Sequence, residues 1–312
     1  MARFIMRDDN PEIPPPYDFP GITIQSFRLP ATLSNLQDIC DKFLNIGTLE
    51  ERGFEYRAFL GFVDMEIVTY PRMAFAEPPY SNWGYASQQE IYFRFFVWKF
   101  VYASGVLWPE PMPQFCIPFI FVDNSWSMIS GRNVIGFPKL MAQFSPATVL
   151  GANPFQISVS TPALKSHSSA TKLQMEPIIS IDPSSGNPQL PDGLWPWLGL
   201  EVSLSDPLLE AYLQLLLAAV PDAFATIELK QFRDAESLTE ACYQAVVATR
   251  FAPSNIGAPQ PLPPVTVTVA KYASLNIPRD LGFPADTPIQ PLLQYAVTLD
   301  LSATGADNLF VR

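Results

Sequence analysis

The chain has 312 residues, of which 48% are hydrophobic and only 16% are charged, so it can bury a large core and is not globally disordered. Its formal net charge is −11 and its lysines and arginines form no cluster, which argues against a nucleic-acid-binding surface. Because the sequence shows neither an apolar run of about 18 residues nor the apolar segment of a signal peptide, we expect a cytoplasmic protein without a membrane partner.

The histidine and cysteine content narrows the chemistry further. The only histidine, His167, lies in a polar, turn-like string, so we expect an ordinary loop residue rather than a member of a catalytic triad. A metal site with several histidines is impossible within one chain. Cys40, Cys116 and Cys242 are far apart in apolar surroundings, which favours small core residues over a disulfide framework or a zinc site. We therefore expect no metal.

The N-terminal part of the chain is rich in proline. Residues 1–20 are expected to form an extended arm across the surface, and residues 21–30 could form a strand. Apolar residues at helical spacing then predict a helix that begins at Ser34, where Ser34 and Gln37 fit a capping box, and that stops at Gly47.

Three strands are predicted next. Residues 53–75 read as strand, with Glu66 between two apolar residues. Since neighbours in a strand point to opposite faces, Glu66 faces either solvent or a cavity. The aromatic segment 89–106 suits a strand that is buried on both faces, and the apolar segment 115–122 predicts another such strand after a turn region.

The second half of the chain adds strands, turns and a helix. Asp206 and Pro207 cap a predicted helix that runs to Val220, and residues 237–249 fit either a helix or a strand. The other segments are a strand at 155–160, a turn-rich stretch at 181–200, strands at 225–232 and 265–269, and a C-terminal extension at 285–312. The sequence thus predicts a single, mainly β (α+β) domain over residues 1–312, with a large antiparallel sheet or barrel and a few peripheral helices.

One lysine is distinguished by its surroundings. Lys139 follows Pro138 at the end of a glycine-flanked, mostly apolar segment that begins at Gly131. Such a lysine is either a solvated surface residue or an amine in a dry pocket. In the pocket, burial disfavours the charged ammonium, and a neutral amine can attack a carbonyl carbon.

The sequence around this lysine resembles the signature of the acetoacetate decarboxylase family. It contains Phe121-Val122-Asp123-Asn124, six further residues, Gly131-Arg132, and then Phe137-Pro138-Lys139, at the spacing of that signature. The likeness covers roughly residues 50–284, with an insertion at 176–224, and leaves the N-terminal arm and the C-terminal extension outside. It implies an acetoacetate decarboxylase-like, barrel-like fold, no cofactor and a homo-oligomer.

The resemblance also assigns roles to single residues. It implies that Lys139 forms a Schiff base with the substrate, and that Glu66 is an active-site glutamate that orients water or moves protons. Phe137 and Arg132 become substrate-binding candidates. Arg132 could instead fix its loop, because a guanidinium offers five hydrogen-bond donors.

A second acidic position of the family falls at residues 85–90. Direct alignment places it at Ser87 or Gln88, and a small shift places it at Glu90, so Gln88 and Glu90 are both candidates for substrate binding. Because strand alternation alone does not say which face is the inner one, an outward-facing Glu90 stays an alternative.

The sequence departs from the family pattern at three positions. Leu140 stands where the family has a second lysine, and Asn133 stands where an acidic residue often follows Gly-Arg. Arg28 is the nearest counterpart of the N-terminal arginine that binds the substrate carboxylate, but it does not align with it. These departures preserve imine chemistry and argue against acetoacetate itself as the substrate.

The leading hypothesis is a Schiff-base-forming lyase that acts on a small-molecule keto acid through Lys139, nominally a β-keto acid decarboxylase. The first alternative is an aldolase, dehydratase or cyclase that uses the same lysine imine or enamine on a larger substrate. The second alternative is a non-catalytic protein that binds an apolar ligand. The long aromatic run favours a substrate larger than acetoacetate.

Overall fold

In the computed structural model of the chain, residues 5, 12, 14–146, 156–185, 225–237 and 239–312 are described. The strands are β1 (Tyr17–Pro30), β2 (Phe54–Ala58), β3 (Phe62–Phe75), β4 (Tyr85–Ala103), β5 (Val106–Pro109), β6 (Gln114–Val122), β7 (Lys139–Met141), β8 (Gln143–Ser145), β9 (Ile157–Ala163), β10 (Gln174–Pro183), β11 (Thr226–Arg233), β12 (Ala241–Ser254), β13 (Gln260–Pro261), β14 (Val265–Val269) and β15 (Leu293–Val311). The helical elements are α1 (Leu33–Ile39), η1 (Cys40–Leu44), α2 (Leu49–Arg52), η2 (Tyr80–Asn82), α3 (Ser125–Ser130), η3 (Gly131–Ile135) and α5 (Ile277–Leu281).

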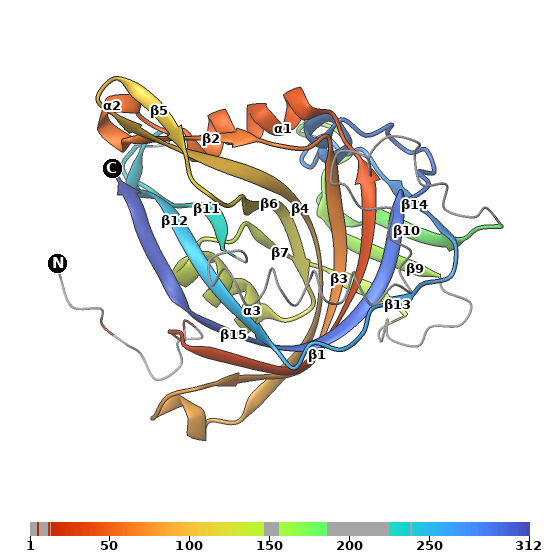
Figure 1. Cartoon of the computed structure of the whole chain (residues 1–312). Helices are drawn as coiled ribbons and strands as arrows, with labels where there is room; N and C mark the ends of the chain where they lie inside the picture. Colours follow the sequence, from red (N-terminus) through yellow and green to blue (C-terminus); the bar gives the residue numbers. More distant parts are fainter. Residues whose placement is uncertain (1–4, 6–11, 13, 147–155, 186–224, 238) are drawn as a thin grey trace.

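The large sheet is closed into a ring. Its strand order is β2-β4-β3-β1-β15-β12-β11-β6-β7, and β6 also pairs with β4. The strands β4, β3, β1, β15, β12, β11 and β6 therefore form a barrel-like wall, which curves around α3 and β7 in Figure 1. The predicted mainly β architecture with few helices is confirmed. The sheet is nevertheless mixed rather than wholly antiparallel, because β6 runs parallel to both β7 and β11.

Both faces of this wall are covered. On β3, Met65 and Ile67 belong to a large outer core, whereas Glu66, Val68 and Tyr70 face the inside of the ring, as alternation along a strand requires. The outer core packs against α1 and η1 and against a second, four-stranded sheet of order β14-β10-β9-β8. The inner face carries a smaller core beside a cavity.

The two chain ends are more central than the sequence indicated. Residues 293–311 lie in β15, which pairs with β1 and β12 in the middle of the large sheet, so the predicted C-terminal extension at 285–312 is an integral strand over most of its length. Likewise β1 begins at Tyr17, inside the predicted 1–20 arm, and pairs with β3 and β15. The arm therefore contributes wall residues rather than only lying across the surface.

Several local predictions need correction. The helix near residue 34 exists as α1 and η1, but Thr32 occupies the N-cap and no side chain caps it, so the Ser34–Gln37 capping box is wrong. Gln37 instead bonds the backbone of β2. The ambiguous segment 237–249 is strand over β12, and β10 extends into the predicted turn-rich stretch 181–200. The predicted helix from Asp206 to Val220 lies outside the described residues.

The cysteines and the histidine follow the sequence analysis with one exception. Cys40 and Cys116 are buried, but Cys242 is exposed and its thiol contacts backbone carbonyls of β11. His167 lies exposed in a bend after β9, as expected for a loop residue. Within the described part of the chain, no helix is long and apolar enough to cross a membrane.

A buried carboxyl group links β6 and β11, a neighbouring strand pair of the ring that shares little backbone pairing. β6 and β11 share one register pair, Phe115 with Thr226, and the amide of Ile117 then donates to Glu228 Oε1 at 2.7 Å. Burial raises the pKa of Glu228 well above its usual range, although the bond from Ile117 acts in the opposite direction. The Glu228 carboxyl group therefore accepts the hydrogen bond that a carbonyl group of a neighbouring strand would otherwise accept, and its contribution to the free energy of unfolding depends on pH.

Glu228→Gln is expected to become more stable relative to wild type as the pH rises. The folded-state pKa of Glu228 lies above the unfolded-state pKa, so its contribution to stability is fully present below the unfolded-state pKa and is lost as the pH rises through the folded-state pKa. Gln keeps an acceptor for the Ile117 amide without that loss. Urea unfolding of both proteins across this pH range measures the difference in free energy of unfolding, and a difference that is independent of pH would contradict the account.

Candidate active site

The inner face of the ring encloses a cavity of about 770 Å³, which lies within the range of about 300–1,000 Å³ that is typical of small-molecule sites. Its walls come from β1, β3, β4, β6, β11, β12 and β15, and α3 and β7 contribute from within the ring. Most lining side chains are apolar or aromatic. Trp83, Tyr85 and Trp126 line it while being strongly exposed, so they mark its open rim.

Lys139 enters this cavity from the first position of β7. It is only 6% exposed, and its Nζ donates to Glu90 Oε2 at 3.1 Å and to Ser127 Oγ at 2.9 Å. The loop before it is tightly turned: Gly136 adopts φ +88° and packs on Lys230 and Val247, where a side chain would be strained and crowded. β7 then aligns with β6, which fixes the lysine against the wall.

Gly131 makes room for the lysine side chain. A Cβ atom at this position would lie 2.6 Å from Lys139 Cδ and 2.8 Å from Cε. The backbone of Gly131 is helical, with φ −60°, so the glycine is needed here for space and not for conformation.

Gly131→Ala is therefore expected to displace Lys139 while leaving the fold intact, because alanine is the best helix former. A misplacement of about 1 Å can cost roughly 100-fold in rate, so we expect a loss of that order in any reaction at Nζ. Gly61→Ala is the control, since its Cβ would meet only the Ala31 carbonyl oxygen at 3.4 Å, away from the cavity. A Gly131→Ala protein with the wild-type rate would show that Lys139 does not need this position.

The partner carboxylate, Glu90, lies on the inner face of β4 and is held by two neighbours. The Tyr70 hydroxyl donates to Glu90 Oε1 at 2.5 Å, and Gln88 Nε2 donates to Oε2 at 3.0 Å. Burial and the adjacent carboxylate raise the pKa of Tyr70 well above its usual value, so Tyr70 stays a hydrogen-bond donor. Gln88, which direct alignment gave together with Ser87, thus supports Glu90, and Glu90 is the residue that contacts Lys139.

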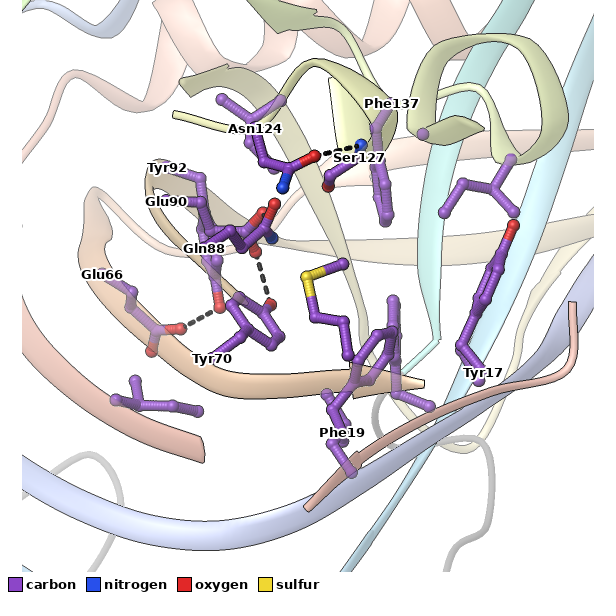
Figure 2. A pocket seen from close by; sticks show the side chains of 18 of the residues that line it. Tyr17, Phe19, Glu66, Tyr70, Gln88, Glu90, Tyr92, Asn124, Ser127 and Phe137 are labelled. Atoms are coloured by element: carbon purple, nitrogen blue, oxygen red, sulfur yellow. Dashed lines mark hydrogen bonds between the residues drawn. The ribbon is translucent and has the colours of Figure 1, made fainter. Parts of the chain in front are cut away.

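Glu66 lines the same cavity but belongs to a second charge pair. Its carboxylate lies 2.7 Å from the Arg94 guanidinium and accepts from the Tyr92 hydroxyl at 2.5 Å. Burial raises the pKa of Glu66, and Arg94 opposes that rise. Figure 2 shows Glu66, Tyr70, Gln88, Glu90 and Tyr92 gathered on one side of the cavity, apart from Tyr17.

The other predicted residues divide into those that line the cavity and those that do not. Phe137 lines it, with its ring centroid 5.9 Å from Lys139 Nζ. Arg132 is exposed, does not line the cavity, and donates to the Lys139 carbonyl oxygen at 2.9 Å, so it fixes the loop. Arg28 does not line the cavity either, because its guanidinium is bound to Asp64. Leu140 packs into the outer core, on the opposite face of β7 from Lys139.

Four residues of the site escaped the sequence analysis: Ser127, Tyr70, Tyr92 and Arg94. Ser127 is positioned by the turn at the start of α3, where the Asn124 side chain accepts from the Ser127 amide (Figure 2). Gln88, Glu90, Tyr92 and Arg94 occupy alternate positions of β4 and therefore point to the same face. Strand alternation would have placed Tyr92 and Arg94 in the cavity once Glu90 was known to face it. Among the described residues, no group of three or more His, Cys, Asp or Glu side chains could hold a metal ion.

The comparisons with known proteins agree with this fold. No protein-family model matches the sequence, and no curated protein matches it either. Among solved structures, an acetoacetate decarboxylase from Legionella pneumophila subsp. pneumophila str. Philadelphia 1 is similar with a TM-score of 0.57 at 12% identity, over 99% of this chain and 90% of that one. An acetoacetate decarboxylase-like enzyme from Sphingomonas wittichii RW1 reaches 0.54 at 12% identity, over 98% of each chain.

A third similar structure is that of MppR, an enduracididine biosynthesis enzyme complexed with pyruvate. Its TM-score is 0.51 at 13% identity, over 95% of this chain and 91% of that one. The chain therefore has the acetoacetate decarboxylase-like fold.

Proposed function

We propose that the protein is an enzyme that forms a Schiff base between Lys139 and the carbonyl group of a keto acid. The observation that carries the proposal is the buried hydrogen bond between Lys139 Nζ and Glu90 Oε2 inside a largely apolar cavity. Support also comes from the solved structures of similar fold, which are of enzymes by name. A buried amine beside a carboxylate has a nucleophile and a proton acceptor within reach of each other.

The first steps follow from this pair. A proton passes from Lys139 Nζ to Glu90, and the neutral amine adds to the carbonyl carbon of the substrate. The protonated Glu90 gives its proton to the oxygen of the adduct, then takes one of the two protons of the adduct nitrogen and passes it to the resulting hydroxyl group. The hydroxyl leaves as water, and the nitrogen with its remaining proton becomes the protonated imine. Ser127 accepts a hydrogen bond from Nζ at 2.9 Å, so it holds the amine toward the cavity. Tyr70 and Gln88 keep the Glu90 carboxyl group in place.

Decarboxylation is the reaction that we assign first. In the imine of a β-keto acid, the bond to the carboxylate breaks and its electron pair flows into the imine, which releases carbon dioxide and leaves an enamine. Protonation of the enamine carbon and addition of water return the ketone and Lys139. The apolar lining would destabilise the substrate carboxylate relative to the uncharged carbon dioxide, which favours this direction.

An aldol addition or dehydration at the same enamine is the second candidate. The cavity is large enough for two reactants, and the similar MppR structure holds pyruvate, a keto acid that is not a β-keto acid. The enamine carbon would then attack an aldehyde instead of taking up a proton.

Isotope exchange and gas release separate the two candidates. The protein is incubated in D₂O with β-keto acids and with pyruvate plus an aldehyde, and carbon dioxide, deuterium uptake and carbon–carbon bond formation are measured. Carbon dioxide release with one deuterium in the ketone supports decarboxylation, and coupling without carbon dioxide release supports the aldol reaction. If neither product and no exchange depends on Lys139, the proposed function is wrong.

A further inference from the structure

The cavity continues well beyond the lysine. Along β4, Gln88, Glu90, Tyr92 and Arg94 all line it, and the four residue steps from Glu90 to Arg94 correspond to about 13 Å of strand. Lys139 is bonded to Glu90, so Arg94 marks an inner end of the cavity that a small keto acid held at Lys139 cannot fill. The apolar residues Ile117 and Val297 line the cavity as well.

Two polar atoms at this inner end have no hydrogen-bond partner among the described residues, although both are buried. They are Arg94 Nε and Thr226 Oγ1, and both residues line the cavity. Both residues neighbour Phe115: the guanidinium of Arg94 lies 4.3 Å from the centroid of its ring, and Thr226 is its register partner on β11. Thr226 is only 5% exposed.

Such a pair of donors is informative because buried polar groups in folded proteins nearly always have a partner. An N–H and an O–H from two residues that neighbour the same ring and line the same cavity are donors for an oxygen atom that accepts hydrogen bonds. The charge of the cavity indicates what kind of oxygen. Lys139 is paired with Glu90, and Arg94 is paired with Glu66. A substrate carboxylate at this end would therefore be repelled by the Glu66 carboxylate and would find no unpaired cation to offset the repulsion.

We propose that Arg94 Nε and Thr226 Oγ1 form a second subsite that binds an uncharged oxygen, such as that of a ketone, of the substrate. The substrate class is then an elongated carbonyl compound, in which an apolar chain joins the carbonyl that reacts with Lys139 to this second oxygen. The inference rests on the proposed function for the role of Lys139, whereas the subsite itself rests on the unpartnered donors and can be tested without imine chemistry.

The test measures binding in the Lys139→Met protein, which cannot form an imine. A ten-carbon methyl ketone is compared with the diketone of the same length, which carries a second ketone near its far end. Quenching of tryptophan fluorescence reports binding, because Trp83 and Trp126 line the cavity. Thr226→Val removes one donor with little change in shape, and we expect it to weaken diketone binding about fivefold or more and to leave the mono-ketone within about twofold.

Thr249→Val is the matched control. Thr249 lies directly across from Thr226 on β12 and is also buried, with a hydroxyl that has no partner among the described residues, but it does not line the cavity. We expect it to leave both affinities unchanged. The proposed subsite would be wrong if Thr226→Val bound the diketone in preference to the mono-ketone as strongly as before. It would also be wrong if Thr249→Val lost as much diketone affinity as Thr226→Val. If the wild type forms no imine but Thr226→Val still selectively weakens the diketone, the subsite stands and the proposed function fails.

Discussion

Lys139→Met is expected to abolish the reaction, with a loss on the order of 10⁴-fold or more, because it removes the nucleophile on which every later step depends. Methionine has a similar length and is apolar, so it suits a position that is 6% exposed. Glu90 keeps its bonds from Tyr70 and Gln88 in this variant. The measurement is the rate of keto acid turnover, with the free energy of unfolding recorded in parallel.

Lys139→Arg separates nucleophilicity from charge. Arginine preserves a cation beside Glu90, but a guanidinium stays protonated and does not form an imine. We expect Lys139→Arg to be as inactive as Lys139→Met. Turnover close to that of the wild type in Lys139→Arg would mean that position 139 acts only as a charge, and the imine account would then be wrong.

Glu90→Gln carries the second-largest expected effect, a loss of about 10²–10⁴-fold in the rate of imine formation, since Glu90 is assigned the proton transfers at Nζ. The substitution is nearly isosteric, and the Gln oxygen can still accept from Tyr70. The pre-steady-state rate of adduct formation at Lys139 isolates the step in which Glu90 acts.

Glu66→Gln is the matched comparison, because Glu66 lines the same cavity and differs in its partner. It neutralises the counterion of Arg94, so we expect it to lower stability by as much as about 3–5 kcal/mol and to slow imine formation less than Glu90→Gln does. If Glu66→Gln impaired the rate of adduct formation more than Glu90→Gln, the assignment of the two carboxylates would have to be exchanged.

The fold could be predicted where local pattern and tertiary environment agree. Alternating apolar residues predicted β3 and β14, and the dense aromatic run predicted β4. These predictions succeeded because the apolar residues of these strands are buried regardless of which strands they pair with. β15 was missed because its partners are far away in the sequence. Thr298 of β15 pairs with Thr23 of β1, more than 270 residues away, and Asp307 pairs with Ala248 of β12, about 60 residues away. The polar residues of β15 gave no local sign of a central strand. In 237–249, alanines allow a helix, and pairing with β11 decides for a strand.

The site was predictable in its residues and less so in its contacts. The signature spacing identified Lys139, and alternation showed that Glu66 faces opposite to its apolar neighbours. Which carboxylate reaches Nζ depends on how β3, β4 and β7 are placed around the ring, and no local pattern contains that information. Leu140 illustrates the same limit: it follows Lys139 directly in the sequence, but the pleat of β7 turns its side chain away from the lysine and into the outer core.

The most direct measurement of the central claim is covalent trapping. The wild-type protein is incubated with β-keto acids of increasing chain length, borohydride is added, and peptides are analysed by mass spectrometry. The account predicts a reduced adduct on Lys139, absent from Lys139→Met and formed much more slowly in Glu90→Gln. An adduct on other lysines only, or turnover of a keto acid without any trappable adduct on Lys139, would contradict it.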